Sequence, residues 1–132
     1  MSMTAENFIA KAGRALEEAR VLLNAGGFEG ACNRAYYAMF DAAHAALLVA
    51  GITLPEAAPK THRSVIASFG LHLVKAGTIA PELGSALNKV ERLRKLADYT
   101  GEVVAEEDAR WAVSQAGDFV SKVRERMFPL ST

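Results

Sequence analysis

The stretch from Ala31 to Leu48 restricts the fold of this chain more than any other segment. At about 100° per residue of an α-helix, one sector of roughly a third of the circumference collects apolar side chains and a cysteine. This sector contains Cys32, Tyr36, Met39, Ala43, Ala46, Leu47 and Ala50. The pattern predicts a long helix with a buried seam, and it places Tyr36 in the packed core.

A polar flank borders this seam. Its members are Asn33, Arg34, Tyr37, Asp41 and His44. A helix that needed only solubility would carry lysine and glutamate there, whereas these groups hydrogen-bond, stack and pair charges. We therefore interpret the flank as a candidate working face. Two interpretations of Arg34 and Asp41 stay open, because a sheltered arginine either needs a carboxylate partner or binds a ligand.

The composition favours an all-α fold. Of the 132 residues, 51% are hydrophobic but only 8% are aromatic, and alanine is frequent, which is typical of closely packed helices rather than sheets. A chain of this length corresponds to one hydrophobic core. We therefore expect a single helical-bundle domain that spans residues 1–132.

Local signals predict about five helices. They are expected at 4–27, 28–51, 61–77, 81–101 and 106–129, with Thr4 and Thr61 as N-caps and Pro81 in a first turn. Glycines end four of these segments, and Gly70 interrupts the third. The two prolines in segment 54–60 predict a mobile loop there. Because the linkers are short, neighbouring helices should pack antiparallel in one up-and-down bundle.

Charge and cysteine usage limit the cellular setting. Fifteen basic and fifteen acidic residues give no net field, so contact with nucleic acid has to come from a local patch. The lone cysteine, Cys32, forms no internal disulfide and is expected to be a small buried hydrophobe, which fits a reducing cytoplasm. No window resembles a membrane span or a signal peptide, so we expect a cytoplasmic protein without a membrane partner.

The common cofactor and metal motifs are missing. The chain has no glycine-rich phosphate loop, no cysteine pair for zinc, no HExxH and no ExxH. The histidines, His44, His62 and His72, are not spaced to share a metal on one helix. We therefore predict neither a metal nor another cofactor. His62 remains a candidate site residue because the loop before it can close over a ligand.

The fourth predicted helix carries the segment Leu93–Tyr99, which reads LRKLADY. Arg94 and Asp98 are four residues apart at the edge of the apolar stripe, so we expect a half-sheltered ion pair. Tyr99 falls on the outward sector together with Asn88, Arg92 and Lys95. A phenol among cations holds a phosphate or nucleotide by charge and stacking. This sector is a candidate binding patch.

Three segments together resemble the HEPN superfamily in its small stand-alone prokaryotic branch. They are the string NRAYYAMF at 33–40, the residues Lys60, Thr61, His62 and Phe69, and the string LRKLADY. Their order and separation match over nearly the whole chain. The resemblance implies a helical bundle that dimerises and that is often encoded beside a minimal nucleotidyltransferase as a toxin–antitoxin pair. It also implies metal-independent ribonuclease activity in many members.

One departure from this family pattern concerns catalysis. Active HEPN ribonucleases resemble one another in an arginine followed four to six residues later by histidine. In this chain Asp98 and Tyr99 follow Arg92 and Arg94, and no histidine does. A carboxylate supplies neither the cation nor the near-neutral acid of an imidazole. In some members the partner nucleotidyltransferase modifies a tyrosine at the end of this segment, so the resemblance makes Tyr99 the candidate acceptor.

Three hypotheses follow. The first is an RNA- or nucleotide-binding member of a nucleotidyltransferase and HEPN module that uses Asn33, Arg34, Tyr37, Arg92 and Lys95, with Arg94 and Tyr99 beside them. The second is a non-catalytic dimerising adaptor. The third is a metal-independent endoribonuclease whose catalytic residues are Arg94 and either Asp98 or Tyr99. The expected partners are a second copy of the chain, a minimal nucleotidyltransferase, and RNA or a nucleotide.

Overall fold

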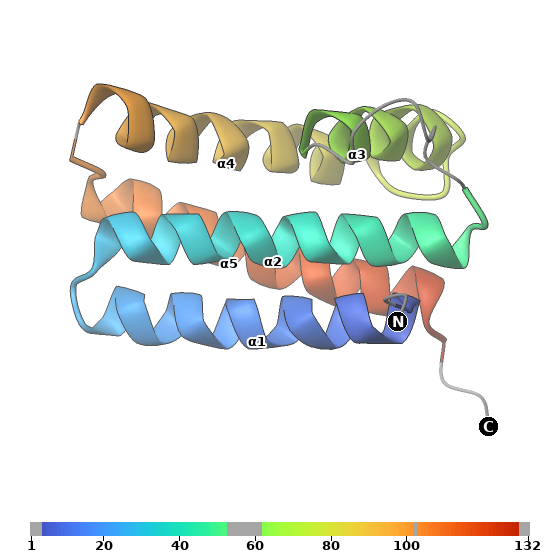
Figure 1. Cartoon of the computed structure of the whole chain (residues 1–132), viewed down its shortest axis with the longest axis horizontal. Helices are drawn as coiled ribbons and strands as arrows, with labels where there is room; N and C mark the ends of the chain where they lie inside the picture. Colours follow the sequence, from blue (N-terminus) through green and yellow to red (C-terminus); the bar gives the residue numbers. More distant parts are fainter. Residues whose placement is uncertain (1–3, 53–61, 102, 130–132) are drawn as a thin grey trace.

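The computed structural model describes residues 4–52, 62–101 and 103–129, and these residues form an all-α fold (Figure 1). Its α-helices are α1 (Ala5–Asn24), α2 (Phe28–Val49), α3 (His62–Phe69), α4 (Pro81–Thr100) and α5 (Glu106–Met127). A π-helical turn, η1 (Gly70–Val74), continues α3. The predicted fold class is confirmed. The loop predicted at 54–60 and the N-cap predicted at Thr61 lie outside the described residues.

The helices form an antiparallel bundle around α2. Figure 1 shows α1, α2, α4 and α5 alternating in direction, with the short α3 beside the part of the bundle where α2 ends. Helix α2 contacts α1, α3, α4 and α5. The predicted up-and-down arrangement is therefore confirmed, and the long central helix has the position that its buried seam predicted.

The helix ends follow the local chemistry of the sequence. Thr4 forms a capping box with Asn7, in which Thr4 Oγ1 accepts from the Asn7 amide at 3.1 Å and Asn7 Oδ1 accepts from the Thr4 amide at 3.0 Å. Pro81 begins α4, where its missing amide hydrogen costs nothing. Gly101 ends α4 in the left-handed region at φ 70°, which favours glycine. These three signals were sufficient to position the ends.

The core around α2 is built mainly from alanines. Seven of its alanines are fully buried, and their small side chains let neighbouring helices approach closely (Ala31, Ala35, Ala38, Ala42, Ala43, Ala45 and Ala46). Larger side chains fill the remaining space, including Phe69 and Phe119, whose ring centroids are 5.3 Å apart. Cys32 is buried as predicted, and burial raises the pKa of its thiol to about 11. It therefore packs as a protonated, unreactive hydrophobe.

The segment after α3 differs from the predicted helix in one respect. At Gly70 the chain does not leave the helix but widens into η1, where the Lys75 amide donates to the Gly70 carbonyl at 2.9 Å. The wider turn leaves Leu71 exposed and Leu73 buried. Within the described residues, no helix combines the length and the apolar character needed to cross a membrane.

Candidate functional site

Two of the segments that the sequence singled out meet in the structure. The Arg94 guanidinium of α4 lies over the ring of Tyr36 on α2, with Cζ 4.6 Å from the ring centroid. The same Cζ is 5.9 Å from the centroid of Tyr37. His62, the first residue of α3, joins them. We call Arg34, Tyr36, Tyr37, His62 and Arg94 the arginine–tyrosine cluster.

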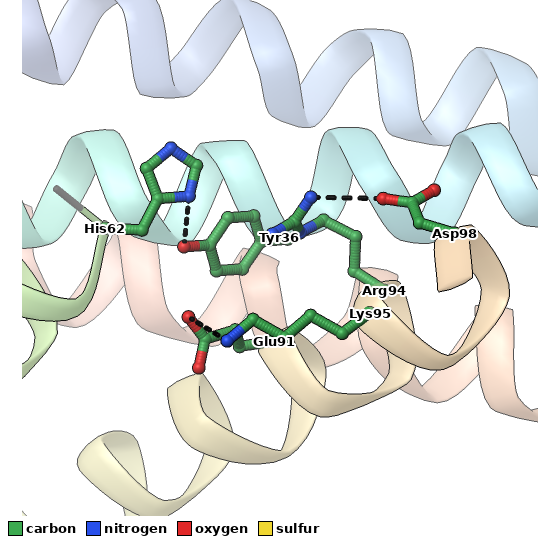
Figure 2. Close-up of polar contacts among 6 residues, drawn as sticks. All are labelled: Tyr36, His62, Glu91, Arg94, Lys95 and Asp98. Atoms are coloured by element: carbon green, nitrogen blue, oxygen red, sulfur yellow. Dashed lines mark hydrogen bonds and ion pairs between the residues drawn. The ribbon is translucent and has the colours of Figure 1, made fainter. Parts of the chain in front are cut away.

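Tyr36 is the buried centre of this cluster. Its side chain is packed in the core as predicted, and its hydroxyl lies 2.9 Å from Nδ1 of His62 (Figure 2). Burial is the main reason that the pKa of the Tyr36 phenol lies well above its usual value, so the phenol stays protonated. Sequence reasoning missed this polar role, because the seam position of Tyr36 indicated only packing.

His62 is surrounded by aromatic rings. Its ring centroid is 4.4 Å from that of Phe40 and 5.5 Å from those of Tyr36 and Tyr37. Desolvation in this setting lowers the pKa of the imidazole, and the positive charge of Arg94 lowers it further. His62 is therefore neutral at neutral pH.

Arg94 makes the ion pair that its spacing predicted. Its Nη1 is 3.1 Å from Oδ2 of Asp98, and the side chain of Arg94 is 15% exposed whereas that of Asp98 is 40% exposed. The pair is therefore half-sheltered, as expected. The Nε atom of Arg94 is buried and has no hydrogen-bond partner among the described residues. One donor of this guanidinium is thus left unsatisfied by the described residues.

Arg34 approaches the same cluster from α2. Its Cζ is 5.6 Å from the Tyr37 centroid, so Arg34 and Arg94 both contact the Tyr37 ring. Its ion-pair partner is Glu18 of α1, with Nη2 and Oε1 3.1 Å apart. In the described part of the chain, Nε of Arg34 and Oδ1 of Asn33 are buried without hydrogen-bond partners.

Among the described residues, Arg34 forms its ion pair with Glu18. The pair of Arg34 with Asp41, which the sequence left open, is therefore not formed. The reason is tertiary: α1 packs along α2 and brings an acidic side chain within 4 Å of the guanidinium. Asp41 itself is buried, and burial raises the pKa of its carboxyl while the charges of Lys11 and Arg34 lower it.

The outward residues of α4 divide into two groups. Asn88 and Lys95 line a groove of about 280 Å³ between α3 and α4, together with Arg63, Ile66, Ala67 and Glu91. Lys95 Nζ lies 3.7 Å from Oε2 of Glu91 (Figure 2). Arg92 and Tyr99 are exposed outside this lining, and Tyr99 is 82% exposed. The structure therefore separates Tyr99 from the groove.

The remaining histidines lie apart from the cluster. His44 stacks on Phe8 with ring centroids 4.1 Å apart, and His72 is exposed on η1. Within the described ranges, no group of three or more histidine, cysteine, aspartate or glutamate side chains is arranged to hold a metal ion.

Comparison with known proteins identifies the same family that the three sequence segments resemble. The family model for the HEPN domain matches residues 5–126. A UPF0332 protein of Gloeobacter violaceus is 32% identical over 127 residues, covering 95% of this chain and 97% of the relative. A UPF0332 protein of Thermotoga maritima is 32% identical over 117 residues, covering 87% of this chain and 84% of the relative.

A third relative carries a name that refers to function. A protein of Methanocaldococcus jannaschii named as a candidate toxin is 35% identical over 112 residues, covering 85% of this chain and 80% of the relative. The residues matched by the HEPN model include the whole arginine–tyrosine cluster. The chain therefore belongs to the HEPN domain family.

Proposed function

We propose that this protein is the HEPN member of a toxin–antitoxin-type module and that it binds RNA or a nucleotide at the arginine–tyrosine cluster. One observation carries the binding proposal: Arg34 and Arg94 contact the same half-buried tyrosine ring, and each keeps a buried Nε donor without a partner in the described structure. The toxin assignment is supported by two relatives that are named as candidate toxins.

The chemistry of the cluster matches a phosphodiester flanked by bases. Guanidinium groups bind phosphate oxygens through charge-assisted hydrogen bonds, and aromatic rings stack on nucleobases with little sequence preference. Arg63 and Lys95, in the adjoining groove, add positive charge beside the cluster. Arg34, Arg94 and Lys95 each pair with a carboxylate. A bound phosphate therefore competes with these carboxylates for the cations.

Partners of the module are part of the same proposal. We infer that a nucleotidyltransferase reaches Tyr99, whose side chain is open to solvent at the end of α4. We also infer a homodimer that buries the exposed apolar side chains near this helix end. These residues are Leu96 and Val103, and Tyr99 stays accessible. The adaptor hypothesis is the alternative outcome, in which the cluster serves packing alone.

RNA affinity of an Arg94 variant tests the binding proposal. Arg94→Ala should weaken binding of a short fluorescent single-stranded RNA, followed by anisotropy, by about tenfold or more, because charged hydrogen bonds contribute about 1.5–3 kcal/mol. Arg110→Ala is the matched control, since Arg110 also pairs with a carboxylate four residues away (Nε to Glu106 Oε2, 2.8 Å) but lies on α5. Its affinity should stay within about twofold of wild type.

Arg94→Lys separates recognition from packing. This variant keeps a cation over Tyr36 but lacks the planar guanidinium fork, so its affinity should fall between those of wild type and Arg94→Ala. Wild-type protein that binds neither RNA nor nucleotides would contradict the proposal. An Arg94→Ala variant that melts at a lower temperature but retains full RNA affinity would assign Arg94 to packing and would place the RNA site outside the cluster.

A further inference from the structure

The groove of about 280 Å³ between α3 and α4 has polar and apolar walls from both helices. On each helix the lining residues repeat at spacings of three and four, so each set shares one helix face. The α3 set is Arg63, Ile66 and Ala67, and the α4 set is Asn88, Glu91 and Lys95. Sites for drug-sized ligands measure about 300–1,000 Å³, so this groove is sized for a smaller group.

Helix α4 connects the groove to the arginine–tyrosine cluster. Glu91 and Arg94 are three residues apart on this helix, so their side chains are neighbours. Figure 2 shows Glu91 and Lys95 on the same stretch of α4 as Arg94. After desolvation, the charge of Glu91 is the largest influence on the pKa of the Tyr36 phenol, and it raises this pKa. The groove therefore adjoins the proposed phosphate site.

Glu91 provides a sheltered acceptor in this groove. Its side chain is 16% exposed, and its ion-pair partner is Lys95, whose Nζ lies 3.7 Å from Oε2. This separation is longer than the 2.7–3.2 Å that is typical of a hydrogen bond from nitrogen to oxygen. The pair therefore leaves hydrogen-bonding capacity on both charges, and a ligand in the groove can reach them because both residues line it.

A carboxylate beside an ammonium group matches the Watson–Crick edge of guanine. This edge presents the acceptor O6 next to two donors, N1–H and the N2 amino group. A glutamate accepts from both donors while a lysine donates to O6, so guanine satisfies the two charges together. Adenine and cytosine instead place a ring-nitrogen lone pair at the centre of this edge, which a carboxylate repels, and uracil has a single donor there.

The rest of the groove suits the same ring. Nδ2 of Asn88 donates to the Gly84 carbonyl at 3.0 Å, so Oδ1 of Asn88 can serve as a second acceptor for the base. Ile66 and Ala67 provide apolar surface for the face of a base. Arg63 is exposed on the α3 wall and adds a positive charge that attracts the strand.

We propose that the groove between α3 and α4 is a guanine-binding subsite, an inference that rests on the RNA binding proposed above. Glu91 accepts from N1–H and the N2 amino group of the base, and Lys95 donates to O6. The cluster then holds a phosphate of the strand, and the groove selects the neighbouring base. The RNA has to be single-stranded at this guanine, because pairing would occupy the same edge of the base.

The inference is tested by the affinities of short fluorescent oligouridine RNAs that carry one central guanine, adenine or hypoxanthine, measured by anisotropy. The wild type should bind the guanine RNA about tenfold or more tightly than the adenine RNA, the discrimination of a good bidentate contact. The hypoxanthine RNA lacks only the N2 amino group and should fall between them.

Glu91→Gln should reduce the preference for guanine over adenine to about twofold or less, because an amide offers one acceptor and one donor in place of two acceptors. The ratio of the two affinities is the readout, since the lost negative charge affects both RNAs alike. Glu125→Gln is the matched control. Glu125 also pairs with a lysine, Nζ of Lys122 at 3.5 Å, but lies on α5, so this variant should keep the wild-type preference.

Ala67→Phe tests the groove without changing a charge. Ala67 is exposed on α3, so a larger side chain is compatible with folding and fills the space that the base would occupy. The preference for guanine should be lost in this variant as well. Melting temperatures close to that of the wild type would show that both groove variants are folded.

The two proposals fail in different ways. If RNA binds in an Arg94-dependent manner but the three RNAs bind equally, or adenine is preferred, the guanine subsite is overturned and the RNA site stands. A guanine preference that survives in Glu91→Gln and Ala67→Phe places base selection outside the groove and also overturns the subsite. If the wild type binds none of the RNAs, both proposals fall. A preference that is lost in Glu91→Gln and kept in Glu125→Gln supports the subsite.

Discussion

Asn33, Arg34 and Arg94 each keep one buried polar atom without a hydrogen-bond partner in the described structure. Such an atom costs about 1–3 kcal/mol relative to its hydrated state, so folding stability gives no reason to retain three of them. All three residues belong to the segments from which a binding or ion-pair role was predicted. Both Nε atoms are closed to solvent, so a ligand would accept from them only after these side chains move.

The carboxyl of Asp41 is another buried polar group whose burial opposes stability when it ionises. The side chain is 4% exposed, and burial raises its pKa above the ordinary value of 3.8. The folded protein therefore binds this proton more tightly than the unfolded chain does. The contribution of Asp41 to stability is fully present below pH 3.8 and falls as the pH rises to the pKa of the folded state.

The corresponding prediction concerns Asp41→Asn, which cannot ionise. Its free energy of unfolding, measured by urea denaturation from pH 4 to 7, should increase relative to that of the wild type as the pH rises. Asp118→Asn, at an exposed position on α5, should show no such trend. If the free energy of unfolding of Asp41→Asn instead decreases relative to that of the wild type as the pH rises, the charges of Lys11 and Arg34 outweigh the desolvation of the carboxylate.

At the scale of the elements, the start of α1 depends on a single side chain. Thr4→Ala removes the acceptor for the Asn7 amide and should lower the free energy of unfolding by about 1 kcal/mol. Thr4→Ser keeps a hydroxyl at the same position and should stay within about 0.5 kcal/mol of wild type. Urea denaturation of the three proteins measures the difference. Equal losses in both variants would show that the methyl group, not the cap, stabilises this end.

Helix ends were predictable because their causes are local. A threonine followed by an asparagine three residues later, a proline, and a glycine that adopts φ 70° act within one turn of the chain. The π-helical turn η1 was not predictable on these grounds. Its wider turn accompanies the burial of Phe69 and Leu73 against helices that lie elsewhere in the sequence, and this packing is absent from local patterns.

At the scale of the molecule, the sequence singled out most members of the arginine–tyrosine cluster as candidates, but it identified neither the polar role of Tyr36 nor the contacts between helices. Spacing along α4 predicted the Arg94–Asp98 pair, because both residues lie on one helix. The contact of Tyr36 with His62 joins residues 26 positions apart and depends on how α2 and α3 rotate against each other. The same limit explains Arg34, whose partner Glu18 comes from α1. Helical periodicity describes each helix alone.

Self-association through the end of α4 is the prediction for the whole molecule. Leu96 and Val103 are 44% and 92% exposed, and burying these side chains against their copies across a two-fold axis removes apolar surface from water. Sedimentation equilibrium should therefore find a dimer, and Leu96→Glu should shift it to monomer. Leu71→Glu is the control, because Leu71 is 56% exposed on η1, toward the other end of the bundle (Figure 1). A monomeric wild type would overturn the prediction. A Leu96→Glu variant that stays dimeric while Leu71→Glu dissociates would move the interface to η1.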